Sequence, residues 1–119
     1  MERKNINEIE VQEIIKDFQL EPRHGLVIIT LNSEQADGGL ILSDNVMSEV
    51  QYVIAVGSHV HDLKPGQKVV VDLEKLSVRT SSQYDTTQTT SQIKIDPVFV
   101  NGQMFGYIDN RSIKSIYKY

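Results

Sequence analysis

The chain has 119 residues, of which 39% are apolar, 24% charged and 7% aromatic, with no Cys and no Trp. This length suits one domain, and the composition is too apolar for a disordered chain. Twelve basic and 16 acidic residues give a formal net charge of −4, without a basic block, so nucleic acid is not an expected partner. The lack of Cys excludes disulfides and Cys-based zinc sites. No apolar run approaches the ~20 residues that a membrane span needs, and the charged N-terminal residues do not resemble a signal peptide, so we expect a cytoplasmic protein.

The first predicted element is a short helix over about residues 8–18. Its apolar face consists of Val11, Ile14, Ile15 and Phe18, which recur at helical spacing. Asn7 followed by Glu10 resembles a capping box at the start of this helix. Pro22 lies beyond the last turn, so the helix is expected to end before it.

Short apolar runs separated by turn signals make up most of the remaining chain. They lie at residues 26–31, 50–57, 68–71, 93–95, 98–100 and 104–108. The pair Asn101-Gly102 predicts a two-residue hairpin, and Pro65-Gly66 predicts a turn before the third run. Residues 77–92 form a polar insertion, and its tract at residues 81–92 is expected to stay exposed to solvent. The pattern favours an all-β fold, a small barrel or sandwich, preceded by the N-terminal helix.

Residues typical of catalysis or metal binding do not form a recognisable set. No glycine-rich phosphate-binding pattern is present. His59 and His61, with Asp62 beside them, are the closest approach to a metal site. No third ligand is evident, and we interpret these residues as part of a solvated connection. His24 is interpreted in the same way, as a structural or surface residue. The sequence therefore predicts no catalytic residue, no metal, no cofactor and no enzyme.

The long connection over residues 32–49 carries the most information about function. It is polar except in its middle, where Leu40, Ile41 and Leu42 follow Gly38 and Gly39. Loops of this length are uncommon unless they have a function. Two interpretations remain open at this stage: a short buried strand, or a mobile loop whose apolar triad is kept for a groove on a partner.

Five segments in order resemble the GroES-like co-chaperonins. Residues 22–29 resemble the family's opening strand, and 38–42 (Gly-Gly-Leu-Ile-Leu) are similar to the Gly-Gly-Ile-Val-Leu of its mobile loop. Residues 53–57 (Val-Ile-Ala-Val-Gly), 63–70 and 107–116 resemble three further motifs of the family. The resemblance implies a GroES-like β-barrel over residues 21–119, with a mobile loop at 32–49, behind an N-terminal extension of residues 1–20.

The departures from the family pattern are also informative. Only eight residues, 58–65, are available where bacterial members carry a roof hairpin, and Gln67 replaces the usual Asp of the next turn. A missing hairpin, together with added segments at the N-terminus and after Val71, resembles the bacteriophage-encoded members. Because members of the family form rings, the missing hairpin also predicts an open or thinly covered centre of such a ring.

The resemblance implies a ring of seven subunits that caps a GroEL-like host chaperonin, which hydrolyses the ATP. The implied chaperonin-binding residues are Gly38, Gly39, Leu40, Ile41 and Leu42. The implied subunit interface pairs Gln19 and Leu20 of one copy with Ile116 and Tyr117 of the next. The implied clients are unfolded proteins such as a phage capsid protein, in the host cytoplasm if the chain is phage-encoded.

Two alternatives stand beside this interpretation. One is a phage structural or assembly β-barrel whose 32–49 loop packs on neighbouring subunits. The other is the GroES-like domain of a medium-chain dehydrogenase, against which the absence of Cys and the short length argue. Binding to a ring chaperonin only in the presence of nucleotide would separate the co-chaperonin from the assembly protein.

Overall fold

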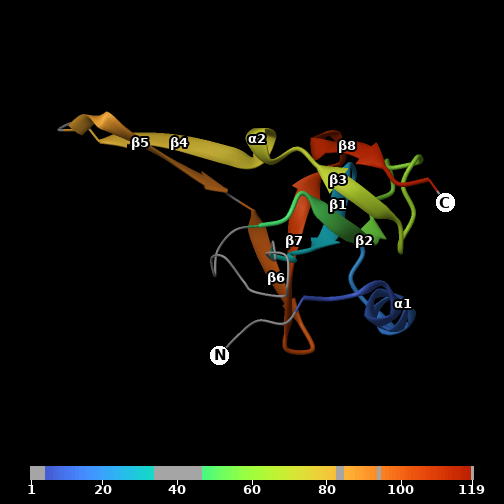
Figure 1. The fold of residues 1–119 in the computed structure, drawn as a ribbon. Coiled ribbons are helices and arrows are strands. Elements are labelled where there is room, and N and C mark those ends of the chain that lie inside the picture. The colour runs from blue at the N-terminus through green and yellow to red at the C-terminus, as the bar shows by residue number, and fades with distance from the viewer. Residues whose placement is uncertain (1–4, 34–46, 83–84, 94, 119) are drawn as a thin grey trace.

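The computed structural model describes residues 5–33, 47–82, 85–93 and 95–118, and for residues 77–93 it describes the backbone alone. The helical elements are α1 (Glu8–Asp17), α2 (Leu73–Leu76) and the 3-10 turn η1 (Asn110–Ser112). The strands are β1 (Leu26–Thr30), β2 (Val50–Val56), β3 (Lys68–Val71), β4 (Ser77–Ser82), β5 (Asp85–Ile93), β6 (Asp96–Val100), β7 (Gln103–Asp109) and β8 (Ile113–Ile116). The described chain is therefore mostly β, as the sequence predicts, with one ten-residue helix (Figure 1).

Six strands form one antiparallel sheet in the order β6-β7-β1-β2-β3-β8. β1 lies near the middle, where Val27 is opposite Val56 on β2 and Ile108 on β7. A register shift between Ile28 and Ile29 marks a bulge in the pairing of β1 with β2, and such bulges increase the local twist. β7 continues through η1 into β8, so the chain passes directly between strands that are far apart in the sheet order (Figure 1).

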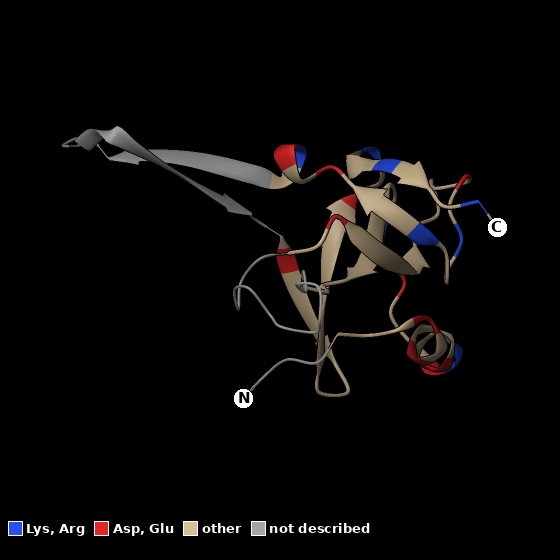
Figure 2. Ribbon diagram, in the orientation of Figure 1, with Lys and Arg blue, Asp and Glu red and all other residues tan. Residues whose placement is uncertain are grey.

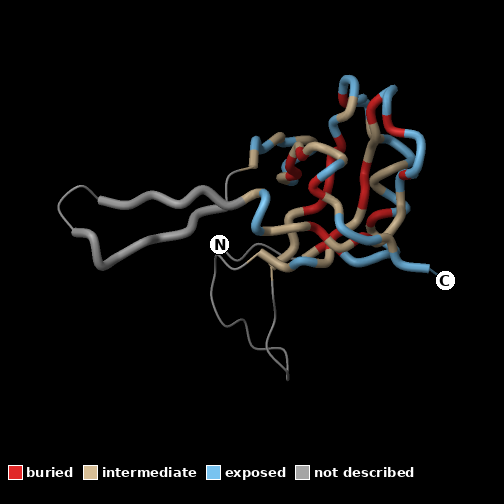
Figure 3. The backbone as a smooth tube through the Cα atoms, turned by 90° about the horizontal axis from the view of Figure 1, so that it is seen from above, coloured by how far each residue is buried: buried red, intermediate tan, exposed pale blue. Residues whose placement is uncertain are grey.

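Both faces of the central strands are covered, as the dense apolar run at 26–31 predicts. On β1, Val27 and Ile29 belong to one core cluster, whereas Ile28 belongs to a second. Successive side chains of a strand point to opposite faces, so the two clusters lie on the two sides of the sheet. Buried positions are accordingly concentrated in the strands of the body (Figure 3).

Helix α1 forms where the sequence predicts it and covers the second cluster. Asn7 caps its first turn, and the reciprocal bond from the Glu10 side chain completes the predicted capping box. Val11 is fully buried in the cluster. Phe18, which follows the helix, meets the ring of Phe105 edge-on at a centroid distance of 5.6 Å. Residues 6–18 of the N-terminal extension thus pack on the sheet as part of the folded body.

The predicted turns form with the expected backbone geometry. Asn101 and Gly102 have φ values of 51° and 78° and connect β6 to β7 as a two-residue hairpin, because a primed turn needs positive φ at both positions. Gly66 has φ 94°. In the same turn the backbone N–H of Lys64 donates to the Gln67 side chain at 2.8 Å, so Gln67 closes this turn from its side chain.

The polar insertion contains two strands, although its sequence carries no strand signal. β4 and β5 pair antiparallel with each other, from Ser77 opposite Ile93 to Ser82 opposite Asp85. This two-stranded ribbon, which we call the arm (residues 77–93), extends away from the six-stranded body (Figure 1). The Ser/Thr/Gln tract has no alternation of apolar residues, so the usual sequence signal for a strand is missing here.

The short connection at residues 58–65 contains no strand, in agreement with the prediction that it has no room for a hairpin. Its backbone follows turns between β2 and β3. Val60 and Leu63 are buried in the first core cluster. This connection therefore closes one end of the core instead of projecting from it.

Candidate functional site

The predicted chaperonin-binding residues, Gly38, Gly39, Leu40, Ile41 and Leu42, lie outside the described residues. The structure does describe both ends of the connection that carries them, where β1 ends and β2 begins. These ends fix where the connection leaves the body and where it returns. We call this region the loop root and define it as Thr30–Ser33, Met47–Tyr52 and the two N-terminal residues Asn5 and Ile6.

Gln51 is the centre of the loop root, and its side chain is fully buried. Its Oε1 accepts from the Thr30 hydroxyl and from the backbone N–H of Asn32, both at 2.8 Å. Its Nε2 donates to the carbonyls of Asn32 at 2.9 Å and Ser48 at 2.8 Å. One side chain therefore joins the outgoing and the returning ends of the connection, with every hydrogen-bonding atom of its amide engaged.

Backbone contacts reinforce this junction. Ser33 and Met47 form an antiparallel bridge, and the N–H of Ser48 donates to the carbonyl of Asn32 at 2.9 Å. These contacts lie at both ends of the predicted mobile loop, residues 32–49. The pairing of β1 with β2 thus continues past the regular strands.

The N-terminal segment binds the outgoing end of the connection through two reciprocal amide pairs. Asn5 donates to the carbonyl of Ser33 and accepts from its N–H, both at 2.9 Å. Asn32 accepts from the N–H of Ile6 at 2.8 Å and donates to its carbonyl at 2.9 Å. Each asparagine amide thus occupies the place that a neighbouring strand would take.

The predicted subunit-interface residues lie on two separate segments. Gln19 and Leu20 are exposed between α1 and β1, and Gln19 lines a hollow of about 430 Å³ beside the β6–β7 turn. Ile116 ends β8 and packs partly into the first core cluster. Tyr117 is 40% exposed, and the Lys68 ammonium lies 4.7 Å from its ring centroid. β8 is the last strand in the sheet order, so one of its edges has no partner strand among the described residues.

Charge is distributed unevenly over these segments (Figure 2). α1 carries four acidic residues, Glu8, Glu10, Glu13 and Asp17, and one basic residue, Lys16. The opposite sign appears at Lys68 on β3, Lys114 on β8 and Lys118 after it. The helix that precedes the Gln19 segment is therefore acidic, and the edge of the sheet at β8 is basic.

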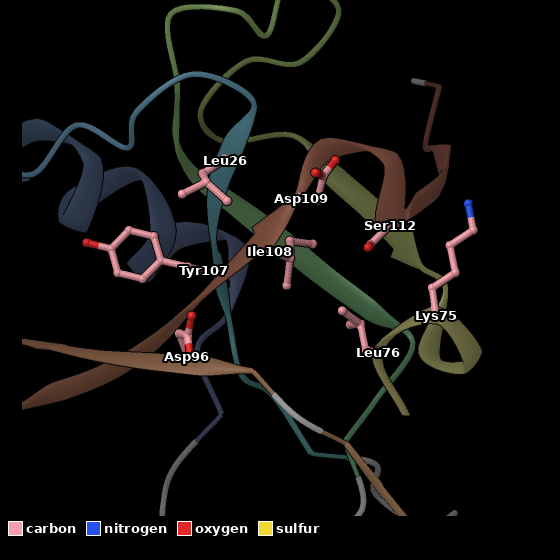
Figure 4. A pocket seen from close by; sticks show the side chains of 8 residues that line it. All are labelled: Leu26, Lys75, Leu76, Asp96, Tyr107, Ile108, Asp109 and Ser112. Carbon is pink, nitrogen blue, oxygen red and sulfur yellow. The ribbon is translucent and has the colours of Figure 1, made fainter. Parts of the chain in front are cut away.

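A pocket of about 550 Å³ lies at the base of the arm (Figure 4). Its lining comes from both sides of the arm and from the ends of β1 and β7, and comprises Leu26, Lys75, Leu76, Asp96, Tyr107, Ile108, Asp109 and Ser112. Asp109 binds the guanidinium of Arg111 at 3.2 Å through both oxygens. The hydrogen bonds from Arg111 lower the pKa of the Asp109 carboxyl, so this carboxylate is held in its ionised form instead of being raised toward an acid-base role.

The histidines do not assemble into a metal site in the part of the chain that the structure describes. The rings of His24 and His59 lie 5.0 Å apart, and His59 and His61 are exposed. No cluster of three or more His, Cys, Asp or Glu side chains is present among these residues. Within the same residues, no helix has the length and apolar character to cross a membrane.

The loop root is a set of residues that the sequence analysis did not identify. Asn5, Asn32 and Gln51 are ordinary polar residues in the sequence. Only the fold brings Asn5 to Ser33, 28 positions away, and Gln51 to Asn32, 19 positions away. A Gln inside the largely apolar run 50–56 is the sequence signal that could have indicated the loop root. No protein-family model matches the chain, and no curated protein matches it.

Proposed function

We propose that this chain is a GroES-like co-chaperonin that caps a GroEL-like ring chaperonin and closes its folding chamber. The observation that carries the proposal is the loop root. It anchors both ends of a connection that contains two glycines and the apolar triad Leu40, Ile41 and Leu42. The ATP is hydrolysed by the chaperonin, and the clients are unfolded proteins held in the chamber.

The sheet supports the fold that this function requires. Side chains from β1, β2, β3, β7 and β8 meet in the first core cluster, which is the arrangement that a curled sheet produces. The direct passage from β7 through η1 to β8 brings the two halves of such a sheet together. A GroES-like barrel is the fold that we propose for residues 21–119 on this basis.

Weak binding by each loop and repetition around a ring explain how such a cap is held and released. A loop that becomes ordered on docking costs about 2–5 kcal/mol, and each fully buried side chain of the triad returns about 1.5–3 kcal/mol. One loop then binds with a Kd in the range of about millimolar to high micromolar. Seven loops on one ring act at high effective concentration, so a small change in each groove is enough for release.

The terminal segments support ring closure. The unpaired edge of β8 is available for the Gln19 and Leu20 segment of a second copy, and this contact removes an open strand edge. The acidic residues of α1 and the basic residues near β8 are complementary in sign, as a head-to-tail contact between copies requires. The heptameric ring is part of the proposal.

Replacing Ile41 with Asp tests the role of the triad. The substitution places a charge against an apolar groove seven times, at a cost of at least ~1–2 kcal/mol per loop. We expect the ring to form as in the wild type but to lose co-elution with a bacterial ring chaperonin in ATP. Ser43→Asp adds the same charge outside the triad and is the matched control. A ring of Ile41→Asp that still co-elutes, or a chain that no longer folds, would contradict the assignment.

One observation favours the second candidate, a phage structural or assembly protein. The arm extends from the body and, among the described strands, β4 and β5 pair only with each other. A two-stranded ribbon leaves strand edges that a neighbouring subunit can pair with. Co-elution that does not depend on nucleotide, or assembly into particles without any chaperonin, would favour this candidate over the cap.

A further inference from the structure

We infer that Asn5 and Asn32 are positioning residues for chaperonin binding, because they fix the direction in which the connection leaves the body. The inference rests on the proposed function and extends it to the N-terminal extension, which then serves as a brace for the loop root. Neither asparagine has to touch the chaperonin for this role.

The brace is made of hydrogen bonds between asparagine side chains and backbone groups. The two amide pairs, Asn5 with Ser33 and Asn32 with Ile6, run in both directions at 2.8 to 2.9 Å. These pairs join the N-terminal segment to the outgoing end of the connection. Gln51 binds the same end from β2. The backbone of Asn32 is therefore held by Gln51 of β2, and the backbone of Ser33 by Asn5 of the N-terminal segment.

The brace is in turn held by the body. Ile6 is buried in the second core cluster, one residue before the helix cap at Asn7. α1 buries Val11 in the same cluster. The N-terminal segment is therefore held against the sheet by the same cluster that holds α1, so the packing of α1 supports the loop root in addition to Gln51.

This arrangement matters for a multivalent cap because the effective concentration of each loop at its groove depends on the direction in which the loop leaves the ring. A loop gains from its six neighbours in the ring only if its root points toward its own groove when the others are bound. A root that is free to swing reduces this gain without changing the contacts of the triad. Loss of the brace should therefore weaken capping even though the triad is intact.

Amide hydrogen exchange measures the brace without any chaperonin. In Asn5→Ala, the N–H of Ser33 loses its acceptor, and we expect its exchange to accelerate by about tenfold or more, as a local opening becomes easier. Asn5→Asp keeps an acceptor oxygen for this N–H but loses the donor to the Ser33 carbonyl, so its exchange should fall between that of the wild type and that of Asn5→Ala. Exchange at Ser33 that is unchanged in Asn5→Ala would overturn the inference.

The second readout is the affinity of the assembled ring for a bacterial ring chaperonin in ATP. We expect Asn5→Ala to weaken binding by about tenfold or more, since the loss in each loop is repeated around the ring. Asn110→Ala is the matched control, because it removes an asparagine amide that donates to the carbonyl of Gly25 at 2.9 Å, remote in sequence from the loop root. This control should lose comparable thermal stability and keep its affinity.

The outcomes separate the inference from the proposed function. If Ile41→Asp abolishes binding but Asn5→Ala binds like the wild type, the positioning role is wrong and the co-chaperonin proposal survives. Equal losses of affinity in Asn5→Ala and Asn110→Ala would show a general effect of stability and would also overturn the positioning role. If the wild-type ring does not bind the chaperonin at all, both proposals fail together.

Discussion

Gln51 shows how one residue can connect separate parts of the chain. It lies on β2, where an apolar side chain would be expected at a fully buried position. A buried polar group is tolerated when its partners are satisfied. The Gln51 amide has four partners in the loop root, and no buried side-chain nitrogen or oxygen among the described residues lacks one.

Replacing Gln51 with Met tests this network at the residue scale. Met has a similar volume but leaves the Asn32 and Ser48 backbone groups and the Thr30 hydroxyl without this partner. We expect the free energy of unfolding to fall by about 2–4 kcal/mol, since each unsatisfied buried group costs about 1–3 kcal/mol. Gln103→Met, at an exposed position, should change it by less than ~0.5 kcal/mol. Chemical denaturation measures both values, and equal effects would contradict the network.

Asp109 gives a prediction about pH. The hydrogen bonds from Arg111 lower its pKa in the folded protein, so its contribution to stability is present above the unfolded value of about 3.9 and is lost as the pH falls through the lower folded pKa. Asp109→Asn keeps an oxygen to cap η1 but removes the charge. We expect its melting temperature to be slightly below that of the wild type at pH 7.

The same difference should disappear in acid, at a pH below the folded pKa of Asp109. The effect is small because the carboxylate side chain is 44% exposed and solvent screens such pairs. Asp62→Asn, at an exposed position of the 58–65 connection, is the control for removal of one acidic residue. A difference between wild type and Asp109→Asn that stays constant down to the acid limit would contradict the ion pair.

At the scale of elements, we expect the body to fold without the arm. β4 and β5 have strand partners only in each other within the described chain. Ser77 lies opposite Ile93, so a short Gly-Ser-Gly link can replace residues 78–92 without stretching the ends. We expect the shortened chain to melt within about 5 °C of the wild type, since no described strand of the six-stranded sheet loses a strand partner. Loss of the folded body, measured by circular dichroism, would show that the arm is part of the core.

Elements with local signals could be predicted from the sequence, and those that depend on distant contacts could not. The capping box at Asn7 and the turn at Asn101 and Gly102 need only neighbouring residues, and both form as expected. The arm was missed because its strands lack apolar alternation. The loop root was missed because residues 5, 32 and 51 come together only in the folded chain. The triad at residues 40–42 lies outside the described residues, so its role stays a prediction.

At the scale of the whole molecule, the charges on α1 and β8 predict how the proposed ring responds to substitution. We expect native mass measurement to give a heptamer at micromolar concentration. Lys114→Glu places an acidic residue at the basic edge and should raise the concentration at which rings dissociate by about tenfold or more, because like charges oppose one another across the contact. Lys64→Glu, in the turn at Pro65, is the control. A stable monomer, or equal effects of both variants, would contradict the proposed interface.

Electron microscopy of the wild-type protein mixed with a bacterial ring chaperonin tests the central claim most directly. The co-chaperonin proposal predicts chaperonin particles with a distinct ring-shaped cap on the open end when ATP or ADP is present. It also predicts bare particles when nucleotide is left out. A field of uncapped chaperonin in the presence of nucleotide, at concentrations where this protein forms rings, would contradict it.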